Sequence, residues 1–298
     1  MSIIVTEIMN SKALRIFILH ILSVFFFITK VSAAPSLLGI FPKGDKPNGL
    51  LFFILTVLAL FVALFIHELG HLMAGLVQGF RFQLFVIGLL GIKRVDNKIK
   101  LFLNKNIGYM GGIAATVPVG PNIKNKRKFA VLIAAGPLAS LSFSILAFIL
   151  FTQAVSGAAR GFWFVEGASS VAIFFATTLP TKSGIFFTDR ARFQRLMSKG
   201  KAGATEEALL TIIAQNVADN SCKHIPLDKA KLLQGDKDQM MRFWGHYYEF
   251  CYFKDNKMQE ECEGARKKLQ SIKDSIPAHL WKALKIDEAG SPVDTLLE

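Results

Sequence analysis

The sequence predicts a mostly α-helical membrane protein with a polytopic transmembrane helical core, a small membrane-associated β region and a C-terminal soluble α-helical domain. Of its 298 residues, 52% are hydrophobic and only 19% are charged, whereas soluble domains have about 25% charged residues. Residues 1–200 hold 21 Lys or Arg against 6 Asp or Glu, while residues 201–298 hold 14 against 16. Basic residues beside long apolar runs are typical of cytoplasmic membrane loops, so we expect no nucleic-acid partner.

Basic residues stand at the start of the first apolar run, Leu14–Thr29. We therefore interpret residues 1–34 as either a signal anchor or a cleavable signal peptide. Both alternatives place the segment that follows on the outer side of the membrane.

Three further apolar runs predict membrane spans, namely Leu50–Val77, Phe129–Val155 and Phe162–Leu179. The first of them exceeds the ~20 residues that a helix needs to cross a bilayer. Between the first two, the stretch Arg81–Lys128 holds ten Lys or Arg and one acid, Asp96. The positive-inside rule places this stretch in the cytosol, which predicts a multi-pass protein of four spans with a cytosolic C-terminus. We expect its last cations, Lys124–Lys128, to contact lipid head groups.

Residues 80–127 combine Val, Ile and Phe with frequent Gly, which predicts short strands beside the membrane. After a linker expected at Gly200–Gly203, residues 204–298 read as amphipathic helices with turns near Asp219, Gly235 and Asp255. The stretch Arg242–Leu269 predicts a helical hairpin within a small bundle. The three cysteines lie in this region without metal-site spacing, which fits the cytosol. We expect this domain to dock a cytosolic partner or to gate the core.

The strongest chemical motif is His67-Glu68-Leu69-Gly70-His71, inside the longest apolar run. Residues four apart lie on one face of a helix, so both imidazoles can bind one Zn²⁺ while Glu68 deprotonates the bound water. Three uncompensated polar groups within a span are costly, which argues against two core histidines that flank a glutamate by chance.

A catalytic zinc ion has three protein ligands, so the two histidines leave one position to be filled. Asp96 and Asp189 are the acids that we expect near the cytosolic membrane face, on the side where His67 lies. Asp189 follows the last span, and Pro180 and Gly184 can break that helix and turn the chain back. Asp189 is therefore a candidate third ligand, and it can also serve as the N-cap of a helix that begins at Arg190.

Four segments occur in the order found in one protein family: Phe65–His71, the glycine-rich stretch Tyr109–Ile113, Ala135–Ser140 and Thr178–Asp189. Over residues 49–195 the chain resembles the site-2 protease family of intramembrane zinc metalloproteases, in its minimal form without a PDZ domain. The resemblance implies a zinc metalloendopeptidase with one catalytic Zn²⁺, acting on membrane-spanning or membrane-associated proteins. It implies that the metal ligands are His67, His71 and Asp189, with Glu68 as the catalytic residue.

The same comparison of motifs suggests where substrate binds, namely at Gly111, Gly112, Ser140 and Thr178. The family often has Asn at the positions of Ser140 and Thr178, and Gly at that of Arg190. Gly111 and Gly112 can equally form a simple turn. The competing interpretation is a catalytically inactive membrane scaffold or transporter subunit of the same fold, which needs no metal.

Overall fold

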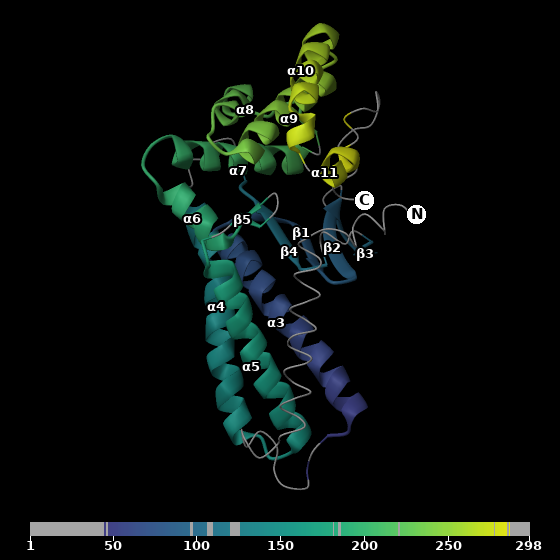
Figure 1. Cartoon of the computed structure of the whole chain (residues 1–298), viewed down its shortest axis with the longest axis vertical. Helices are drawn as coiled ribbons and strands as arrows, with labels where there is room; N and C mark the ends of the chain where they lie inside the picture. The colour runs from purple at the N-terminus through teal and green to yellow at the C-terminus, as the bar shows by residue number, and fades with distance from the viewer. Residues whose placement is uncertain are drawn as a thin grey trace. The chain divides into compact units, whose positions relative to one another are not determined.

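The computed structural model describes residues 45, 47–95, 98–105, 110–119, 126–180, 182–183, 186–219, 221–276, 278–284 and 286. The predicted signal segment 1–34, Asp96 and Tyr109 lie outside these residues. The described chain divides into two compact units. The first holds the residues up to Val77 together with Leu84–Ala115 and Val131–Ala191, and the second holds the remainder. Most of the described chain is helical, with one four-stranded sheet and one small hairpin (Figure 1).

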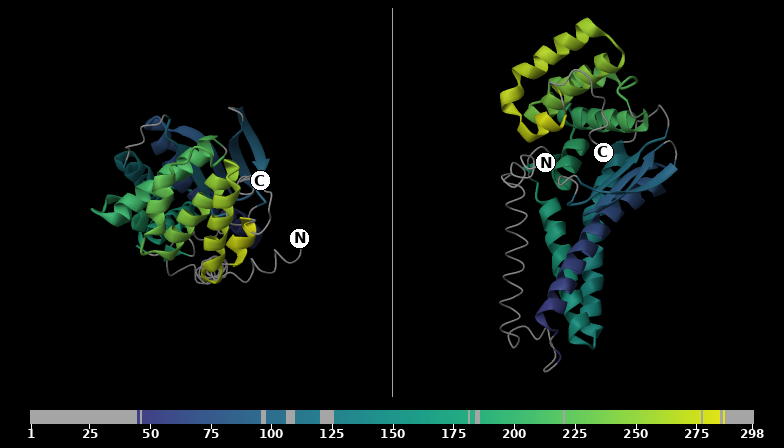
Figure 2. Two further views of the ribbon diagram at one scale, coloured as in Figure 1. Left: turned by 90° about the horizontal axis from the view of Figure 1, so that it is seen from above. Right: turned by 90° about the vertical axis from the view of Figure 1, so that its right-hand side faces the viewer.

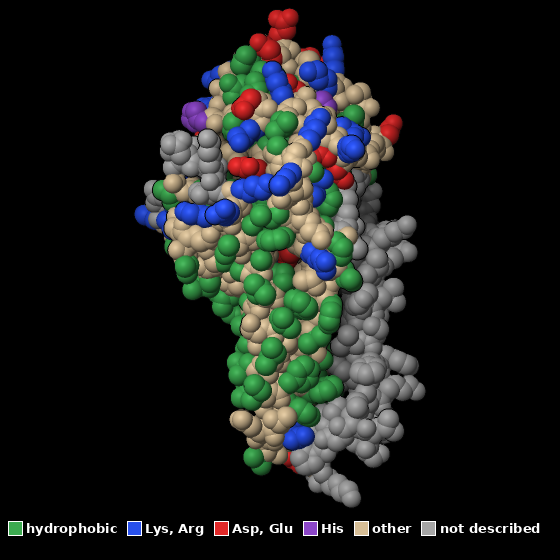
Figure 3. Space-filling view, turned by 90° about the vertical axis from the view of Figure 1, so that its left-hand side faces the viewer, with side chains coloured by type: hydrophobic (Ala, Val, Ile, Leu, Met, Phe, Trp, Pro, Cys, Tyr) green, Lys and Arg blue, Asp and Glu red, His purple; other side chains and the backbone are tan. Residues whose placement is uncertain are grey.

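Three long helices lie side by side in the first unit (Figures 1 and 2). They are α3 (Gly49–Val77), α4 (Lys126–Gln153), whose first turn belongs to the second unit, and α5 (Gly157–Thr178). Their bounds agree within a few residues with those of the three apolar runs, except that α5 starts earlier. Figure 3 shows hydrophobic side chains along the helices, as expected of surfaces that face lipid.

Two of the described helices, α3 and α4, are long and apolar enough to cross a membrane. Helix α5 is not one of these two, and it contains Arg160 and Glu166. The first of the four predicted spans lies outside the described residues. Four crossings therefore stay a prediction, as does the cytosolic C-terminus.

Helices α3 and α4 approach each other closely at Gly70. A Cβ atom at this position would lie 2.6 Å from the carbonyl oxygen of Ala135 and 2.7 Å from the Cβ of Ala139. Small residues allow such close packing of membrane helices. The approach brings the α3 segment between His67 and His71 directly against α4.

The strand-rich stretch forms a sheet of β1 (Arg81–Ile87), β2 (Leu90–Val95), β3 (Lys98–Leu103) and β4 (Ile113–Val117). The strand order is β3-β2-β1-β4, so β3 and β4 are the two edges. Strands β1 and β2 pair antiparallel through a tight turn in which Gly88 has a φ of 56°. The sheet confirms the predicted β region.

A short hairpin follows α5 and leads into a polar helix. Its strands are β5 (Lys182–Ser183) and β6 (Phe186–Phe187), and the helix is α6 (Asp189–Met197). Helix α5 ends at Thr178, with Leu179 as its C-cap. The helix break predicted near Pro180 is therefore present, and it places Asp189 at the first position of α6.

The second unit contains the C-terminal helices. They are α7 (Lys201–Asp219), α8 (Leu227–Gln234), α9 (Gln239–Asp255), α10 (Gln259–Ser271), the 3₁₀ helix η2 (Lys273–Ser275) and α11 (Ala278–Ala283). The predicted turns and the helical hairpin α9–α10 are confirmed. Helix α6 ends at Met197 and α7 begins at Lys201, so of the predicted linker Gly200–Gly203 only Gly200, with a φ of 100°, lies between the helices. Gly203 serves close packing in α7, since a Cβ atom would overlap the carbonyl oxygen of Ser198.

Candidate metal centre

His67 and His71 lie one turn apart on α3, and their Nε2 atoms are 3.3 Å apart. Each ring is held from behind by α4. The Nδ1 of His71 contacts the carbonyl oxygen of Leu132 at 2.8 Å, and the Nδ1 of His67 contacts the hydroxyl of Ser140 at 3.0 Å. A carbonyl oxygen only accepts, so Nδ1 of His71 is the donor and its neutral ring keeps the Nε2 lone pair for a metal.

The carboxylate of Asp189 joins the two histidines. Its Oδ2 lies 3.3 Å from Nε2 of His67 and 3.5 Å from Nε2 of His71. Bonds of about 2.0–2.1 Å in a tetrahedral zinc site place the ligand atoms roughly 3.3–3.4 Å from one another. All three separations fit that geometry, and these residues form a group that can hold a metal ion.

The two histidines, when they are protonated, favour the ionised form of Asp189. Burial alone raises the pKa of this carboxyl, but its contacts with His67 and His71 outweigh burial and hold the pKa below its ordinary value. The ionised carboxylate is the form that binds metal. Asp189 is the first residue of α6, one position beyond the N-cap that the sequence suggested.

Glu68 packs against the glycine-rich turn before β4. Gly112 has a φ of 103°, and a Cβ atom there would lie 2.6 Å from Cγ of Glu68 and 2.9 Å from its Oε1. The backbone N–H of Ala114 donates a hydrogen bond to the Glu68 carboxylate. Gly111, by contrast, has nothing within 4 Å of the position a Cβ atom would take. Of the two predicted substrate-binding glycines, the structure brings Gly112 to the site.

The family comparison agrees with this geometry. A family model described as Peptidase family M50 matches residues 55–295. The chain belongs to peptidase family M50. The match includes His67, His71 and Asp189, and no PDZ domain was found with it. Membership implies a membrane metalloprotease, in agreement with the apolar helices and the metal-binding group. No curated protein and no solved structure matches the chain.

In this M50 chain, two of the other predicted substrate-binding residues have intramolecular partners. Ser140 contacts His67, and Thr178 donates to the carbonyl oxygen of Phe174 on its own helix at 2.6 Å. The Nη1 of Arg190 lies 3.5 Å from the carbonyl oxygen of Thr178. Arg190 therefore contacts the last turn of α5 from the exposed side. Substrate binding at Ser140 and Thr178 stays a prediction.

Gly136 is a functional residue that the sequence did not single out. A Cβ atom at this position of α4 would overlap the imidazole ring of His71. The residue lies inside the motif Ala135–Ser140, directly before Pro137. A glycine in the middle of an apolar helix, where it lowers helix propensity, was the available signal.

Proposed function

We propose that this M50 peptidase is a zinc endopeptidase that hydrolyses peptide bonds of membrane-spanning or membrane-associated proteins. The observation that carries the proposal is the spacing of 3.3–3.5 Å among Nε2 of His67, Nε2 of His71 and Oδ2 of Asp189. Two imidazole nitrogens and one carboxylate oxygen are a ligand set that zinc takes in catalytic sites, with the fourth position left for water.

Glu68 acts as the general base and acid. Bound zinc supplies a Lewis acid that lowers the pKa of a coordinated water toward 7 and polarises the scissile carbonyl. Glu68 interacts electrostatically with His71, His67 and Asp189, so its carboxylate lies close enough to the metal centre to accept the water proton and to deliver it to the departing amine. The N–H of Ala114 orients that carboxylate.

The substrate segment must be extended, because the carbonyl groups of an intact helix are already hydrogen-bonded. Strand β4 is an edge of the sheet and follows Gly112, which packs on Glu68. An extended peptide added to this edge would form backbone hydrogen bonds near the catalytic carboxylate. We therefore assign β4 as the surface that binds the unwound substrate, with Gly112 between it and Glu68.

We also propose a membrane topology and a cytosolic partner for this protein. Positive-inside asymmetry supports four spans with a cytosolic C-terminus. Within Lys124–Lys128, Lys126 and Lys128 donate to the carbonyl oxygens of Ser198 and Gln78, so the other cations of this stretch would contact lipid head groups. The helical region of residues 204–298 would dock a cytosolic partner. These assignments rest on charge distribution and architecture.

Replacing Glu68 tests the reaction. Glu68→Gln removes the proton acceptor but leaves all three ligands, so the variant should bind zinc like the wild type and lose cleavage. Comparison of membrane proteomes with wild type and Glu68→Gln should show a membrane protein that accumulates uncut in the variant.

The scaffold or transporter interpretation makes the opposite forecast. It expects no zinc in the purified wild-type protein and no protein that accumulates uncut. Zinc that is present in the wild type and lost in His67→Ala would exclude that interpretation, whereas wild-type turnover by Glu68→Gln would overturn the mechanism.

A further inference from the structure

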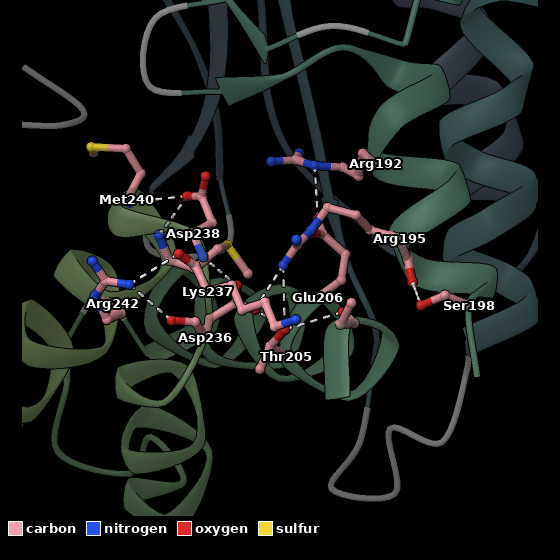
Figure 4. Close-up of polar contacts among 12 residues, drawn as sticks. Arg192, Arg195, Ser198, Thr205, Glu206, Asp236, Lys237, Asp238, Met240 and Arg242 are labelled. Carbon is pink, nitrogen blue, oxygen red and sulfur yellow. Dashed lines mark hydrogen bonds and ion pairs between the residues drawn. The ribbon is translucent and has the colours of Figure 1, made fainter. Parts of the chain in front are cut away.

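A buried charge cluster holds helix α6 a few residues after Asp189 (Figure 4). Arg192 and Arg195 both reach Glu206 on α7, and Arg195 also reaches Asp236. The Nε of Arg192 forms an ion pair with Oε1 of Glu206 at 3.0 Å, and the Nε of Arg195 donates to Oε2 of Glu206 at 3.2 Å. The Nη2 of Arg195 contacts Oδ2 of Asp236 at 2.8 Å. Two guanidinium groups thus face two carboxylates.

Glu206 occupies the centre of this cluster. Its side chain is 0% exposed, whereas those of Arg192 and Arg195 are 25% and 18% exposed. A buried carboxylate is costly unless its oxygens are paired, and both oxygens of Glu206 face an arginine on α6. Arg192 and Arg195 are three residues apart and therefore neighbours on one face of α6. The Glu206 carboxylate thus restrains α6 through two of its residues, by an ion pair with Arg192 and a hydrogen bond from Arg195.

The end of α6 is tied by further contacts. The hydroxyl of Ser198 donates to the carbonyl oxygen of Arg195 at 2.7 Å. The Nζ of Lys126 donates to the carbonyl oxygen of Ser198 at 3.1 Å. Lys126 is the first residue of α4, the helix whose Leu132 and Ser140 hold the two histidine rings. Lys126 lies at the start of α4 and Ser198 directly after α6, so this contact joins the ends of the two helices within the second unit.

We propose that Glu206 is a positioning residue for the metal centre. Asp189 lies three residues before Arg192 on a helix of only nine residues, so a shift of that helix moves the Asp189 carboxylate with it. Ligands need to be held within about 0.5 Å of their working geometry. Glu206 supplies that restraint through Arg192 and Arg195, without touching metal or substrate. This inference rests on the proposed ligand set.

The test compares two buried glutamates of the C-terminal helices in the full-length, detergent-purified protein. Glu206→Gln removes the charge that faces α6. Glu249→Gln is the matched control, because Glu249 is also buried and contacts Gln234 and Lys268. Zinc affinity is measured by chelator competition, ligand geometry by the absorption of bound Co²⁺, and stability by thermal unfolding.

We expect both variants to unfold at lower temperature than the wild type, but only Glu206→Gln to change the metal centre. Its zinc affinity should fall about 10–100-fold, as for other residues that orient metal ligands, and its Co²⁺ spectrum should change. Arg192→Gln, which leaves Arg195 on Glu206, should give a smaller loss and serves if Glu206→Gln does not fold. Unchanged zinc affinity in folded Glu206→Gln, or in Arg192→Gln in its place, would overturn the inference.

Asp189→Ala separates this inference from the function it rests on. If Asp189→Ala binds zinc as tightly as the wild type does, the ligand set itself is wrong. If Asp189→Ala loses affinity and Glu206→Gln does not, the ligand set stands and the positioning role falls. Equal losses in Glu206→Gln and Glu249→Gln would show a general effect of destabilisation and also contradict the positioning role.

Discussion

His67 and His71 each contact α4 through Nδ1, which leaves Nε2 facing Asp189. Their orientation therefore depends on residues of α4 as much as on their own spacing. Such partners of metal-binding histidines fix the tautomer and the ring plane. At the scale of single residues, the geometry of the site therefore depends on how α3 packs against α4.

Gly136 is the residue on which this contact depends most directly. Gly136→Ala should displace the ring of His71, because the new Cβ atom would overlap it, and should lower zinc affinity at least tenfold. Gly111→Ala is the matched control, since nothing lies within 4 Å of the position its Cβ atom would take. Chelator competition on both purified variants measures the difference, and equal affinities would show that the ring of His71 tolerates the methyl group.

Asp189 and Asp96 offer a second comparison at this scale. Asp189→Ala removes a ligand and should reduce zinc affinity by more than the roughly 10–100-fold typical of a residue that merely orients one. Asp96→Ala should leave zinc binding unchanged, because Asp96 stands among cations with which it can pair at the surface. Metal analysis of both variants decides the assignment. Zinc retained without Asp189 and lost without Asp96 would reverse it.

The sequence predicted part of this site for a clear physical reason. His67, Glu68 and His71 are neighbours within one helix, so helical periodicity alone places them together. Asp189 could be proposed because Pro180 breaks the preceding helix. The Gly136–His71 and Ser140–His67 contacts depend on how α3 and α4 cross, and periodicity within one helix carries no information about that.

At the scale of secondary-structure elements, α6 makes contacts that its own sequence does not reveal. Arg192 and Arg195 pair with buried carboxylates. Their partners Glu206 and Asp236 lie 11 or more residues away in the chain. No local pattern reveals such a pairing. Gly203 was assigned to a linker, whereas it lies in α7 and allows close packing there.

The cluster around α6 should make stability depend on acidic pH. Burial raises the pKa of Asp236, but hydrogen bonds from Thr205, from the backbone N–H of Asp238 and from Arg195 outweigh it and hold the pKa below its ordinary value. The unfolded chain, with an aspartate pKa of about 3.9, then binds more protons than the folded chain. The stabilisation is complete above this pH and is lost as the pH falls toward the folded-state pKa.

We expect the free energy of unfolding of the full-length protein to fall as the pH drops below about 4. Asp236→Asn should reduce that dependence and lower stability at neutral pH. Urea titrations of wild type and variant between acidic and neutral pH measure both effects. If the variant keeps the full pH dependence, other groups account for it.

At the scale of the whole molecule, the second unit extends further toward the N-terminus than the predicted domain. The expected boundary was residue 204, whereas the C-terminal segment of the compact unit runs from Arg192 onward and is joined by Gln78–Gln83 and Thr116–Ala130. A fragment that begins at residue 204 keeps Glu206 and Asp236 but lacks both arginines that face them. Unpaired buried carboxylates are strongly destabilising.

Two fragments test where this unit begins. Residues 192–298 should be more stable than residues 204–298 by about 3–5 kcal/mol, the cost of removing one side of a buried ion pair. Urea unfolding of the two purified fragments measures the difference, and Arg195→Ala in the longer fragment should remove much of it. Equal stability of the two fragments would place the boundary at residue 204, as first expected.

The arrangement of helices and strands could be predicted in those parts of the sequence that have a strongly biased composition. Continuous apolar runs predicted α3, α4 and most of α5. Val, Ile and Phe interrupted by glycines predicted the sheet, and a turn between two amphipathic stretches predicted the α9–α10 hairpin. The number of membrane crossings is less accessible, because α5 combines apolar residues with Arg160 and Glu166. Whether these two charged side chains are buried depends on the neighbouring helices, which cannot be deduced from the composition of α5.

The contact between α3 and the start of α6 also brings together two parts of the chain that are far apart in the sequence. Residues 71 and 189 are separated by about 120 positions, so an ion held by His71 and Asp189 would close a loop of that length. In the chain-entropy model, a crosslink over about 100 residues reduces the conformational entropy of the unfolded chain, which stabilises the folded state by about 4.7 kcal/mol. Zinc would then act in this protein as a reversible crosslink as well as a catalyst. Its removal by a chelator would weaken the attachment of α6 to α3.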